Sequence, residues 1–485
     1  MNSTAGVADL ALIIPELILL VTALALILLA PRIRRGPAAA VGTVLAALAA
    51  ALASAWVLPS DTVTGFGGMI TQDGYSGFFK ILIAAALALA ALLSVRGSED
   101  DEDEDEAPRG EYHALLLLAS IGMMLAVSTV DLLTLYLGLE LMTICSYILV
   151  GIHVQRPTSN EAAIKYFLVA SFASALLLYG ISLTYGFAGS TGFSTVASAL
   201  SAHDPGRSPL VVVAIVLVLG GLAFKIAAVP FHSWAPDAYQ GASAPVAAFL
   251  AAGSKAAGLA ALGRVTFVAY GSAAEVLSVL LAGLAALSIV VGSITLLAQT
   301  DMKRLLAYSS IAHAGYAILG LIAGTPAGIS ATMTYAFFYV FMTLGAFGVV
   351  IALGKRGATL DGYKGLAAQH PVAAALMLLF LLSLTGLPPT AGFVAKFVVI
   401  LSAVRAGHMV LAVLAVACSV ISAFVYMRVA VYMFMREPEE PAPSRWPVAV
   451  SAALAVAALV TLIGGISPAS LMSWAVAPGM QAIPQ

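Results

Sequence analysis

Long apolar segments alternate with short polar ones along almost the whole chain of 485 residues. A helix needs about 20 apolar residues to cross the hydrocarbon core of a bilayer. By that criterion the pattern predicts fourteen membrane-spanning helices, here called spans 1 to 14, at residues 10–30, 38–58, 75–96, 112–129, 131–151, 161–188, 209–231, 242–269, 275–298, 303–324, 327–353, 371–403, 408–435 and 446–474. We therefore expect an all-α, polytopic membrane protein whose spans form one bundle.

The composition agrees with a chain that is solvated by lipid. Hydrophobic residues make up 61% of the sequence and charged residues 9%, whereas a soluble domain carries about a quarter charged residues. Cys145 and Cys418 lie in apolar stretches and indicate neither a disulfide scaffold nor a metal site. Residues 1–9 lack the positive charge of a cleavable signal peptide and contain Asp9, so we expect span 1 to be retained.

Basic residues between the spans predict the orientation of the chain. With the N-terminus outside, the external side holds three basic residues near span ends, Arg207, Arg264 and Arg405. The cytoplasmic loops contain thirteen: Arg32, Arg34, Arg35, Arg96, Arg109, Arg156, Lys303, Arg304, Lys355, Arg356, Lys364, Arg436 and Arg445. Cytoplasmic loops are enriched in Lys and Arg, so this bias favours both the orientation and the number of spans.

One predicted cytoplasmic loop contains eight consecutive acids, Glu99 to Glu106. A run of like charges is usually disordered and solvated, and we expect that here. A tail that binds cations or a partner is the alternative. Acidic residues have little influence on membrane topology, so this run does not contradict the orientation.

Five charged residues are predicted to lie deep inside spans: Lys225, Lys255, Lys396, Arg428 and a single acid, Glu140. Each costs about 3 kcal/mol to insert, so five cost roughly 15 kcal/mol, as much as the whole stability of a typical domain. A static buried ion pair would explain at most one of the four cations. Ionisable groups inside a membrane usually mark an ion pathway, and we therefore expect a role in translocation.

Lysine is suited to proton transfer in such a setting. Burial disfavours its charged form, and a carboxylate nearby favours it. Glu140 beside Lys225 would therefore control whether that lysine holds or releases a proton. Lys80 and Lys165 lie near the starts of spans 3 and 6, where side chains that extend to the lipid headgroups are an alternative to a role in translocation.

Prolines interrupt two of the predicted spans close to a lysine. Pro230 follows Lys225 in span 7, and Pro388 and Pro389 precede Lys396 in span 12. A proline inside a helix removes a backbone hydrogen bond, and the freed carbonyls must be buried in protein or meet water. Paired broken helices are typical of inverted repeats. Because the breaks are five spans apart, we interpret spans 4–8 and 9–13 as two repeats of opposite orientation, with a hydrated pocket at each break.

Two histidines are further candidates. His313 lies in the middle of span 10, and a packing residue and a proton carrier are equally compatible with that position. His232 follows the break in span 7, where it could line the route by which protons enter or could cap the broken helix. Four polar neighbours accompany His313 in span 10: Tyr308, Ser309, Ser310 and Tyr316. We interpret the tyrosines and methionines elsewhere as packing residues.

Four motifs identify a resemblance to a known family. In chain order they read KYFLVASFASALLLYG, FKIAAVPFHSWAPDAYQGASAPV, MKRLLAYSSIAHAGY and LTGLPPTAGFVAKF. Together they resemble the antiporter-like membrane subunits of respiratory complex I, the bacterial NADH:quinone oxidoreductase. The resemblance covers spans 4 to 13 closely. It implies fourteen helices in two inverted five-helix repeats, and a channel that moves protons while other subunits oxidise NADH and reduce quinone.

The resemblance also implies roles for four residues. Glu140 is the glutamate of span 5, paired with Lys225 of span 7. Lys255 of span 8 links the two half-channels, and Lys396 of span 12 lies on the exit side. Within the family, the M branch carries glutamate at this last position, so Lys396 favours the N branch. The L branch has a long lateral helix and a further span, which are not expected in a chain that ends at Gln485. The sequence departs from the family pattern in two places. One is the acid run at 99–106. The other is the segment FVAKF, where the family often has a glycine before the lysine.

The expected organisation follows from these spans. Residues 1–111 hold the first three helices and the acidic loop, 112–270 the first repeat, 271–435 the second repeat and 436–485 the last helix. No nucleotide, flavin or cysteine-cluster motif is found, so NADH, FMN, the iron–sulfur clusters and quinone are expected on partner subunits.

The expected partners are the other membrane-arm subunits in a bacterial cell membrane, with no nucleic acid. Two alternatives remain open from the sequence. One is a cation/proton antiporter of the Mrp type, built from the same module. The other is a membrane scaffold subunit whose buried charges do not move protons.

Overall fold

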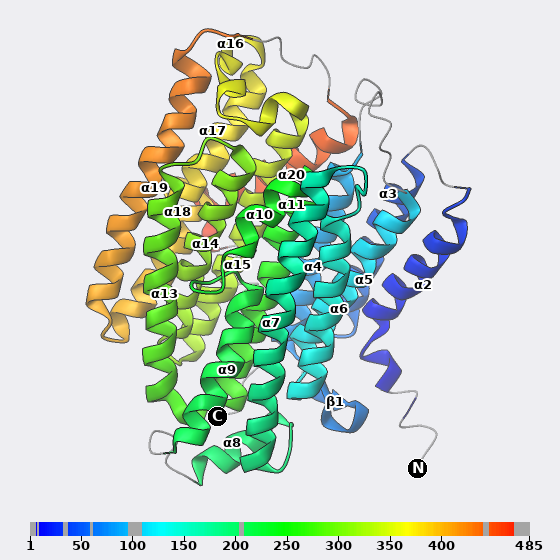
Figure 1. Cartoon of the computed structure of the whole chain (residues 1–485), viewed down its shortest axis with the longest axis vertical. Coiled ribbons are helices and arrows are strands. Elements are labelled where there is room, and N and C mark those ends of the chain that lie inside the picture. The colour runs from blue at the N-terminus through cyan, green and yellow to red at the C-terminus, as the bar shows by residue number, and fades with distance from the viewer. Residues whose placement is uncertain are drawn as a thin grey trace.

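The computed structural model describes residue 6 and residues 9–32, 37–58, 62–95, 109–202, 208–439 and 446–469. They form a bundle of long helices (Figure 1). Helices α2 and α3 lie at one edge of the bundle and α19 at the opposite edge. Several positions used in the sequence predictions lie outside the described residues, namely the acid run at 99–106, Arg34, Arg35, Arg96, Arg207, Arg445 and Gln485.

Among the described residues, the N-terminal part has four α-helices and one small hairpin. In chain order the elements are α2 (Ile14–Leu29), α3 (Ala38–Trp56), β1 (Val63–Gly65), β2 (Ile70–Gln72), α4 (Gly74–Leu93) and α5 (Arg109–Ser128). The strands pair antiparallel, with Val63 opposite Gln72 and Gly65 opposite Ile70. Asp73 and Ser76 then form a reciprocal capping box at the start of α4.

The next part contains the first helix break and two π-helical turns. Its elements are α6 (Leu132–Val150), α7 (Pro157–Ala188), α8 (Phe193–Ser201), α9 (Pro209–Lys225), α10 (Trp234–Gly241), α11 (Ala244–Phe249), a π turn (Leu250–Ser254), α12 (Lys255–Arg264) and a second π turn (Val265–Ala269). Residues 246–264 are buried without exception. This stretch therefore lies in the middle of the bundle.

The remaining part contains the second break. Its main helices are α13 (Ala274–Leu296), α14 (Met302–Leu321), α15 (Pro326–Ala352), α16 (Leu366–Gln369), α17 (Pro371–Thr385), α18 (Ala391–Arg405), α19 (Met409–Met435) and α20 (Val448–Ile466). Short 3₁₀ turns lie at Phe66–Gly68, Gly271–Ala273, Gly354–Ala358 and Asp361–Tyr363. Helix α16 lies at one end of the bundle, and α8 and the β1 hairpin lie at the other (Figure 1).

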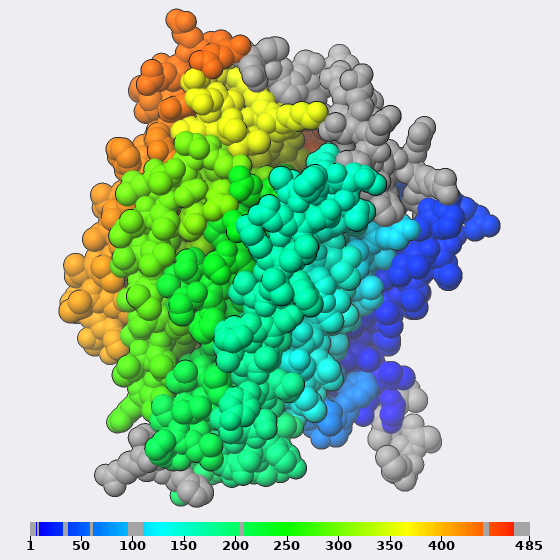
Figure 2. All heavy atoms as spheres, viewed as in Figure 1, coloured from blue at the N-terminus to red at the C-terminus, as the bar shows by residue number. Residues whose placement is uncertain are grey.

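Among the described residues, ten helices are long and apolar enough to cross a membrane. Three further apolar helices are shorter: α2, α9 and α17. The shortness of α9 and α17 has a direct cause, because each ends at one of the predicted breaks. Apolar side chains cover the outer surface, including Val410, Val420 and Phe424 of α19. The face formed by α7 and α13 is visible in Figure 2.

Both breaks occur at the prolines that the sequence singled out. Helix α9 ends at Lys225, and the chain turns through Pro230 before α10 begins. Helix α17 ends at Thr385, where Gly386 adopts a left-handed backbone conformation with φ 87°. Glycine suits that position because it has no Cβ to clash there. The two breaks place irregular backbone inside the bundle, next to the candidate lysines.

Candidate functional site

Lys225 and Glu140 form a buried ion pair between α9 and α6. The Lys225 ammonium lies 3.2 Å from Glu140 Oε1 and donates a hydrogen bond of 2.6 Å to Thr143 Oγ1. Ser174 of α7 donates to the same carboxylate. Lys225 is buried, whereas the Glu140 side chain is 22% exposed on the outer face of α6. The structure thus brings together the two residues that the sequence paired.

The break in α9 explains how Lys225 is positioned. Lys225 is the last helical residue, so its side chain leaves the helix where the backbone turns away. The Phe224 carbonyl accepts a hydrogen bond from the Trp234 indole at 3.1 Å, and Ser288 accepts one from the Val229 amide at 2.9 Å. Polar groups freed by the break are therefore satisfied by protein, as buried backbone requires.

Lys255 has different surroundings. It begins α12 directly after a π turn, a feature that is common at functional sites. Its ammonium is buried and donates to Ser310 Oγ of α14 at 2.6 Å. Ser310 in turn donates to the Ala307 carbonyl at 2.7 Å. Within the described part of the chain, no carboxylate lies within ion-pair distance of Lys255.

Lys396 of α18 is held by the second break. It donates to the Thr385 carbonyl at 2.9 Å, which the end of α17 leaves free, and lies 3.1 Å from Ser419 Oγ of α19. Its ammonium also lies over the Tyr316 ring, 4.4 Å from the ring centre. A Cβ at Gly386 would meet the lysine side chain at 2.8 Å. The broken helix therefore solvates this cation with a backbone carbonyl and leaves room for its stem.

One face of α14 connects the last two lysines. Ser310, His313 and Tyr316 follow one another at intervals of three residues, so they lie along one side of the helix. Ser310 contacts Lys255 and Tyr316 contacts Lys396, while His313 lies between them. His313 Nδ1 is 2.7 Å from the Tyr335 hydroxyl of α15.

His232 lies in the turn between α9 and α10 and is partly exposed. Its Nδ1 is buried and has no hydrogen-bond partner among the described residues. No hydrogen bond joins it to Lys225 or Lys255 in the part of the chain that the structure describes. The structure thus places His232 beside the break but not in contact with the ion pair.

The structure excludes the interpretation that Lys80 extends to the lipid headgroups. Lys80 is fully buried and forms an ion pair of 2.8 Å with Glu16 of α2, together with hydrogen bonds of 3.2 Å to the Leu12 carbonyl and to Gln72 Oε1. Glu16 is itself buried, so Glu140 is not the single deep acid that the sequence predicted. The sequence prediction used only the distance of Lys80 from the end of its span. It could not show that α2 and the β1–β2 hairpin cover the Lys80 side chain. Lys165, in contrast, is 48% exposed and contacts Glu161 and Asp237.

Two arginines have static partners. Arg264, which the sequence placed near the external end of span 8, is buried and forms two hydrogen bonds of 2.8 and 2.9 Å with Asp73. Arg428 donates to the carbonyls of Leu297 and Gln299, just after the C-terminal end of α13. That end carries partial negative charge, which a cation stabilises. Arg428 therefore needs no role in translocation, although the sequence counted it among the deep charges.

A charged cluster joins α10, α14 and α7 next to the site. Asp237 accepts a hydrogen bond of 2.7 Å from Arg304 and lies 3.3 Å from the Lys165 ammonium. Burial alone would raise the pKa of the Asp237 carboxyl, but hydrogen bonds and charge from Arg304 and Lys165 outweigh burial and lower that pKa below its ordinary value of 3.8. The α10 segment of the break is thereby fixed to both neighbouring helices.

Sequence reasoning missed the tyrosines of α15. Tyr335 and Tyr339 are buried, their rings are nearly parallel with centres 6.4 Å apart, and both contact the His313 ring. They were interpreted as packing because they lie in an apolar segment. The spacing of Tyr335, Tyr339 and Thr343, four residues each, is the signal that could have placed their hydroxyls on one face.

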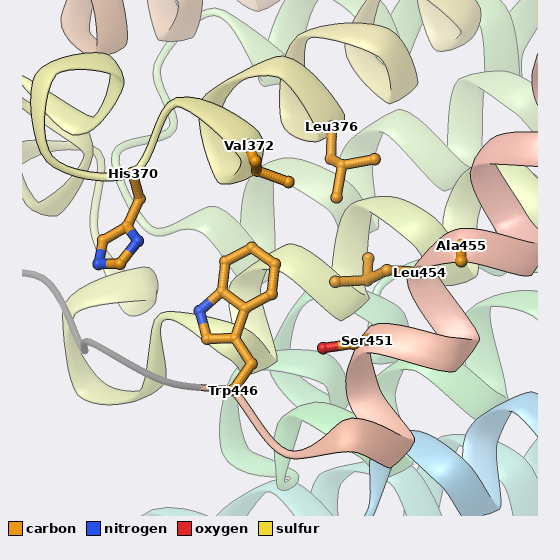
Figure 3. Close-up of a pocket in the computed structure, with 7 residues that line it drawn as sticks. All are labelled: His370, Val372, Leu376, Trp446, Ser451, Leu454 and Ala455. Atoms are coloured by element: carbon orange, nitrogen blue, oxygen red, sulfur yellow. The ribbon is translucent and has the colours of Figure 1, made fainter.

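A cleft of about 450 Å³ lies away from these groups, between α17 and α20 (Figure 3). It is lined by His370, Val372, Leu376, Trp446, Ser451, Leu454 and Ala455. None of the buried lysines faces it. Among the described residues, no group of three or more His, Cys, Asp or Glu side chains could hold a metal ion.

A helical bundle with two broken helices, each holding a buried lysine, defines an antiporter-like membrane protein. Comparisons with known proteins agree. Residues 129–422 match the family described as NADH:quinone oxidoreductase/Mrp antiporter, TM. NADH-quinone oxidoreductase subunit N of Desulfovibrio desulfuricans is 45% identical, and the alignment covers 96% of each chain. The chain therefore belongs to the family of subunit N of NADH-quinone oxidoreductase, the respiratory complex I.

Solved structures show the same fold. A chain of respiratory complex I from Thermus thermophilus is 36% identical over 95% of this chain and 99% of its own length, with a TM-score of 0.81. A chain of the Mrp complex from Dietzia has a TM-score of 0.85 over 97% of each chain. Its identity of 22% shows a shared fold alone.

Proposed function

We propose that this subunit conducts protons through the membrane arm of complex I, along Glu140, Lys225, Lys255, His313 and Lys396. The observation that carries the proposal is the contrast among the three buried lysines. Lys225 has a carboxylate partner, whereas Lys255 and Lys396 have hydroxyl, carbonyl and ring partners in the described structure. A buried ammonium without a carboxylate readily gives up its proton, and such groups in a membrane usually line an ion pathway.

Each residue has a distinct role in this proposal. Glu140 stabilises the charged form of Lys225, so movement of the pair apart releases a proton from Lys225. Lys255 receives it at the centre of the bundle. His313 passes it on to Lys396, whose carbonyl and serine partners stabilise the charged form only weakly. His232 lines the route from the cytoplasm to the break in α9.

The proposed architecture has fourteen spans in two inverted repeats. In it, α9 and the break that follows it make up one span, and α17 with α18 make up another broken span. The π turns belong to the span that runs from α11 through α12. The first repeat occupies residues 112–270 and the second 271–435, flanked by 1–111 and 436–485. The breaks after α9 and after α17 are five predicted spans apart, and this odd offset supports the assignment of two repeats of opposite orientation.

The partners in this proposal are neighbouring membrane-arm subunits. Glu140 is partly exposed between Leu137 and Ile144, which are 61% and 42% exposed on α6. A carboxylate that faces lipid is costly, so a protein surface is expected to cover this face. NADH, FMN, iron–sulfur clusters and quinone would lie on other subunits, in a complex that acts as a proton translocase. The chain would lie in the bacterial cell membrane with its N-terminus outside.

The test is Lys225→Ala in the intact complex, with Lys364→Ala as the control. Lys364 is a lysine of comparable size whose partners, Asp361 and Glu439, are both largely exposed. Proton uptake per NADH oxidised, measured in inverted membrane vesicles, should fall for Lys225→Ala and stay unchanged for Lys364→Ala. Normal assembly with unchanged uptake in both variants would leave a scaffold role. Uptake that requires sodium would favour an Mrp-type antiporter.

A further inference from the structure

The cleft between α17 and α20 changes in chemistry from one end to the other (Figure 3). At one end lie the rings of His370 and Trp446, which come just before the first residues of α17 and α20 and have centres 6.3 Å apart. Toward the other end the lining is apolar, with Leu376 of α17 facing Leu454 and Ala455 of α20. Ala455 lies about 10 Å along α20 from its first residue. The cleft therefore has a polar mouth and an apolar interior.

The cleft lies where a membrane lipid can reach it. Helix α17 follows α16 directly, so the mouth lies at the end of the bundle where α16 lies (Figure 1). In the orientation proposed above, this end is the cytoplasmic one, and the mouth lies at the level of the headgroups, where tryptophan is enriched. Val372 is 65% exposed, and Ser451 and Ala455 are also exposed. The cleft therefore opens on the outer surface of the bundle, which lipid surrounds.

The mouth offers a hydrogen-bond donor that the protein leaves unused. Trp446 Nε1 is buried and has no partner among the described residues, and an indole N–H can only donate. Figure 3 shows this nitrogen on the side of the indole that faces His370. Buried donors almost always have an acceptor. The described residues that line the cleft include no carboxylate, so we expect the acceptor to come from a bound molecule.

We propose that this cleft binds one phospholipid of the cytoplasmic leaflet. Its phosphodiester oxygens accept hydrogen bonds from Trp446 Nε1 and from the His370 ring, and one acyl chain lies between Leu376 and Leu454. Oxygens of a phosphodiester are acceptors only, which matches donors at the mouth. The volume of about 450 Å³ lies within the range of about 300–1,000 Å³ that is usual for sites of small molecules.

Charge near the mouth favours the same ligand. Gln369, the residue before His370, accepts a hydrogen bond of 2.6 Å from the Arg356 guanidinium. Basic groups at the cytoplasmic side of membrane proteins attract anionic headgroups. A helix of another subunit fits less well, because it is about 10 Å wide and its backbone carbonyls are already bonded within the helix. Such a helix could supply an acceptor to Trp446 only through a side chain.

The lipid site is separate from the proposed proton path but borders it through one helix. Helix α17 begins at the mouth of the cleft and ends at Thr385, whose carbonyl binds Lys396. A lipid in the cleft would pack against the first half of this broken span and fill the space between it and α20. The inference therefore adds a ligand to the second break without adding a step to proton transfer.

A density map of the intact complex in nanodiscs tests the inference directly. The nanodiscs contain phosphatidylglycerol and phosphatidylethanolamine with brominated acyl chains, so that lipid is distinguished from detergent and from protein. We expect bromine density between Leu376 and Leu454, and a phosphate within hydrogen-bond distance of Trp446 Nε1. An empty cleft, a detergent molecule without bromine, or a helix of another subunit in the cleft would overturn the inference.

A pair of variants on α20 provides a second measurement. Ala455→Phe places a ring in the apolar part of the cleft, and Ala452→Phe is the matched control, because Ala452 is also exposed on α20 but does not line the cleft. The phospholipid retained by the purified complex, counted by mass spectrometry, should fall by one molecule in Ala455→Phe and stay unchanged in Ala452→Phe.

Equal retention of phospholipid in the two variants would overturn the lipid site. If Ala455→Phe did not assemble, the map of the unsubstituted complex would decide the question. Normal proton uptake in Lys225→Ala would overturn the proposed function and leave the lipid site standing, so the two failures are distinguishable.

Discussion

The Lys225 ammonium lies 3.2 Å from the Glu140 carboxylate, although 85 residues separate them in the chain. The contact joins the end of α9 to the middle of α6, and the carboxylate is partly exposed while the ammonium is buried. A change at the outer face of α6 can therefore reach the lysine directly. The charge partner of Lys225 is therefore partly exposed at the surface of this chain.

Replacing Glu140 with Gln should lower coupled turnover. The neutral amide keeps the shape of the side chain but no longer stabilises the Lys225 ammonium. We expect NADH-driven proton uptake in inverted vesicles to drop about tenfold, since a close charge partner contributes at least about 1.4 kcal/mol. Glu161→Gln is the control, because Glu161 is 65% exposed and paired only at the surface. Equal uptake in the two variants would show that the ion pair is not needed for proton movement.

Replacing Lys396 with Met should block transfer after His313. The Thr385 carbonyl and Ser419 would lose their donor, and no other described cation lies within reach of them. We expect uptake to fall in the intact complex while assembly stays normal. Ser419→Ala removes one of several Lys396 contacts, so its effect should be smaller than that of Lys396→Met. If proton uptake fell more in Ser419→Ala than in Lys396→Met, the proton would pass through Ser419 and not through Lys396.

The Glu16–Lys80 pair should act on stability rather than on transfer. Lys80→Met leaves Glu16 as an unpaired buried acid, which costs about 3–5 kcal/mol. The double variant with Glu16→Gln removes both charges and should recover much of that loss. Thermal unfolding of the purified complex measures the loss of stability in Lys80→Met and its recovery in the double variant. Lys165→Met is the exposed control and should cost less than about 1 kcal/mol. If Lys80→Met and the double variant unfolded at one temperature, the pair would not be a coupled unit.

The Asp237 cluster should stabilise the protein over the whole physiological pH range. The pKa of Asp237 is lowered, so its contribution is fully present above the ordinary value of 3.8 and is lost only as the pH falls below it. Asp237→Asn should therefore lower the unfolding temperature by the same amount at pH 6 and pH 8. A loss that differed between these two pH values would mean that another group titrates with the cluster.

The sequence anticipated the features that depend on covalent chemistry. Pro230 and Pro388 lack the backbone N–H that a helix interior needs, and a lysine inside an apolar run must be buried, so the breaks and the deep cations could be predicted. The pairing of Glu140 with Lys225 came from the family resemblance and from the shortage of other acids.

The remaining features depend on packing, which a linear pattern does not contain. Lys80 looks like a residue near a span end, yet the hairpin and α2 cover it. Arg428 looks like a deep free charge, yet α13 ends beside it. In the sequence Tyr339 has the features of a core aromatic. Only the structure shows that its hydroxyl lies close to Ser310.

The ion pair between α2 and α4 has a consequence for how the chain is made. Glu16 leaves the ribosome more than sixty residues before Lys80, so the first helix enters the translocon with an acid whose partner does not yet exist. That helix is a poor independent membrane segment until the third one arrives. Biosynthesis should therefore hold the N-terminal helices at the insertion machinery as a group, and release them together.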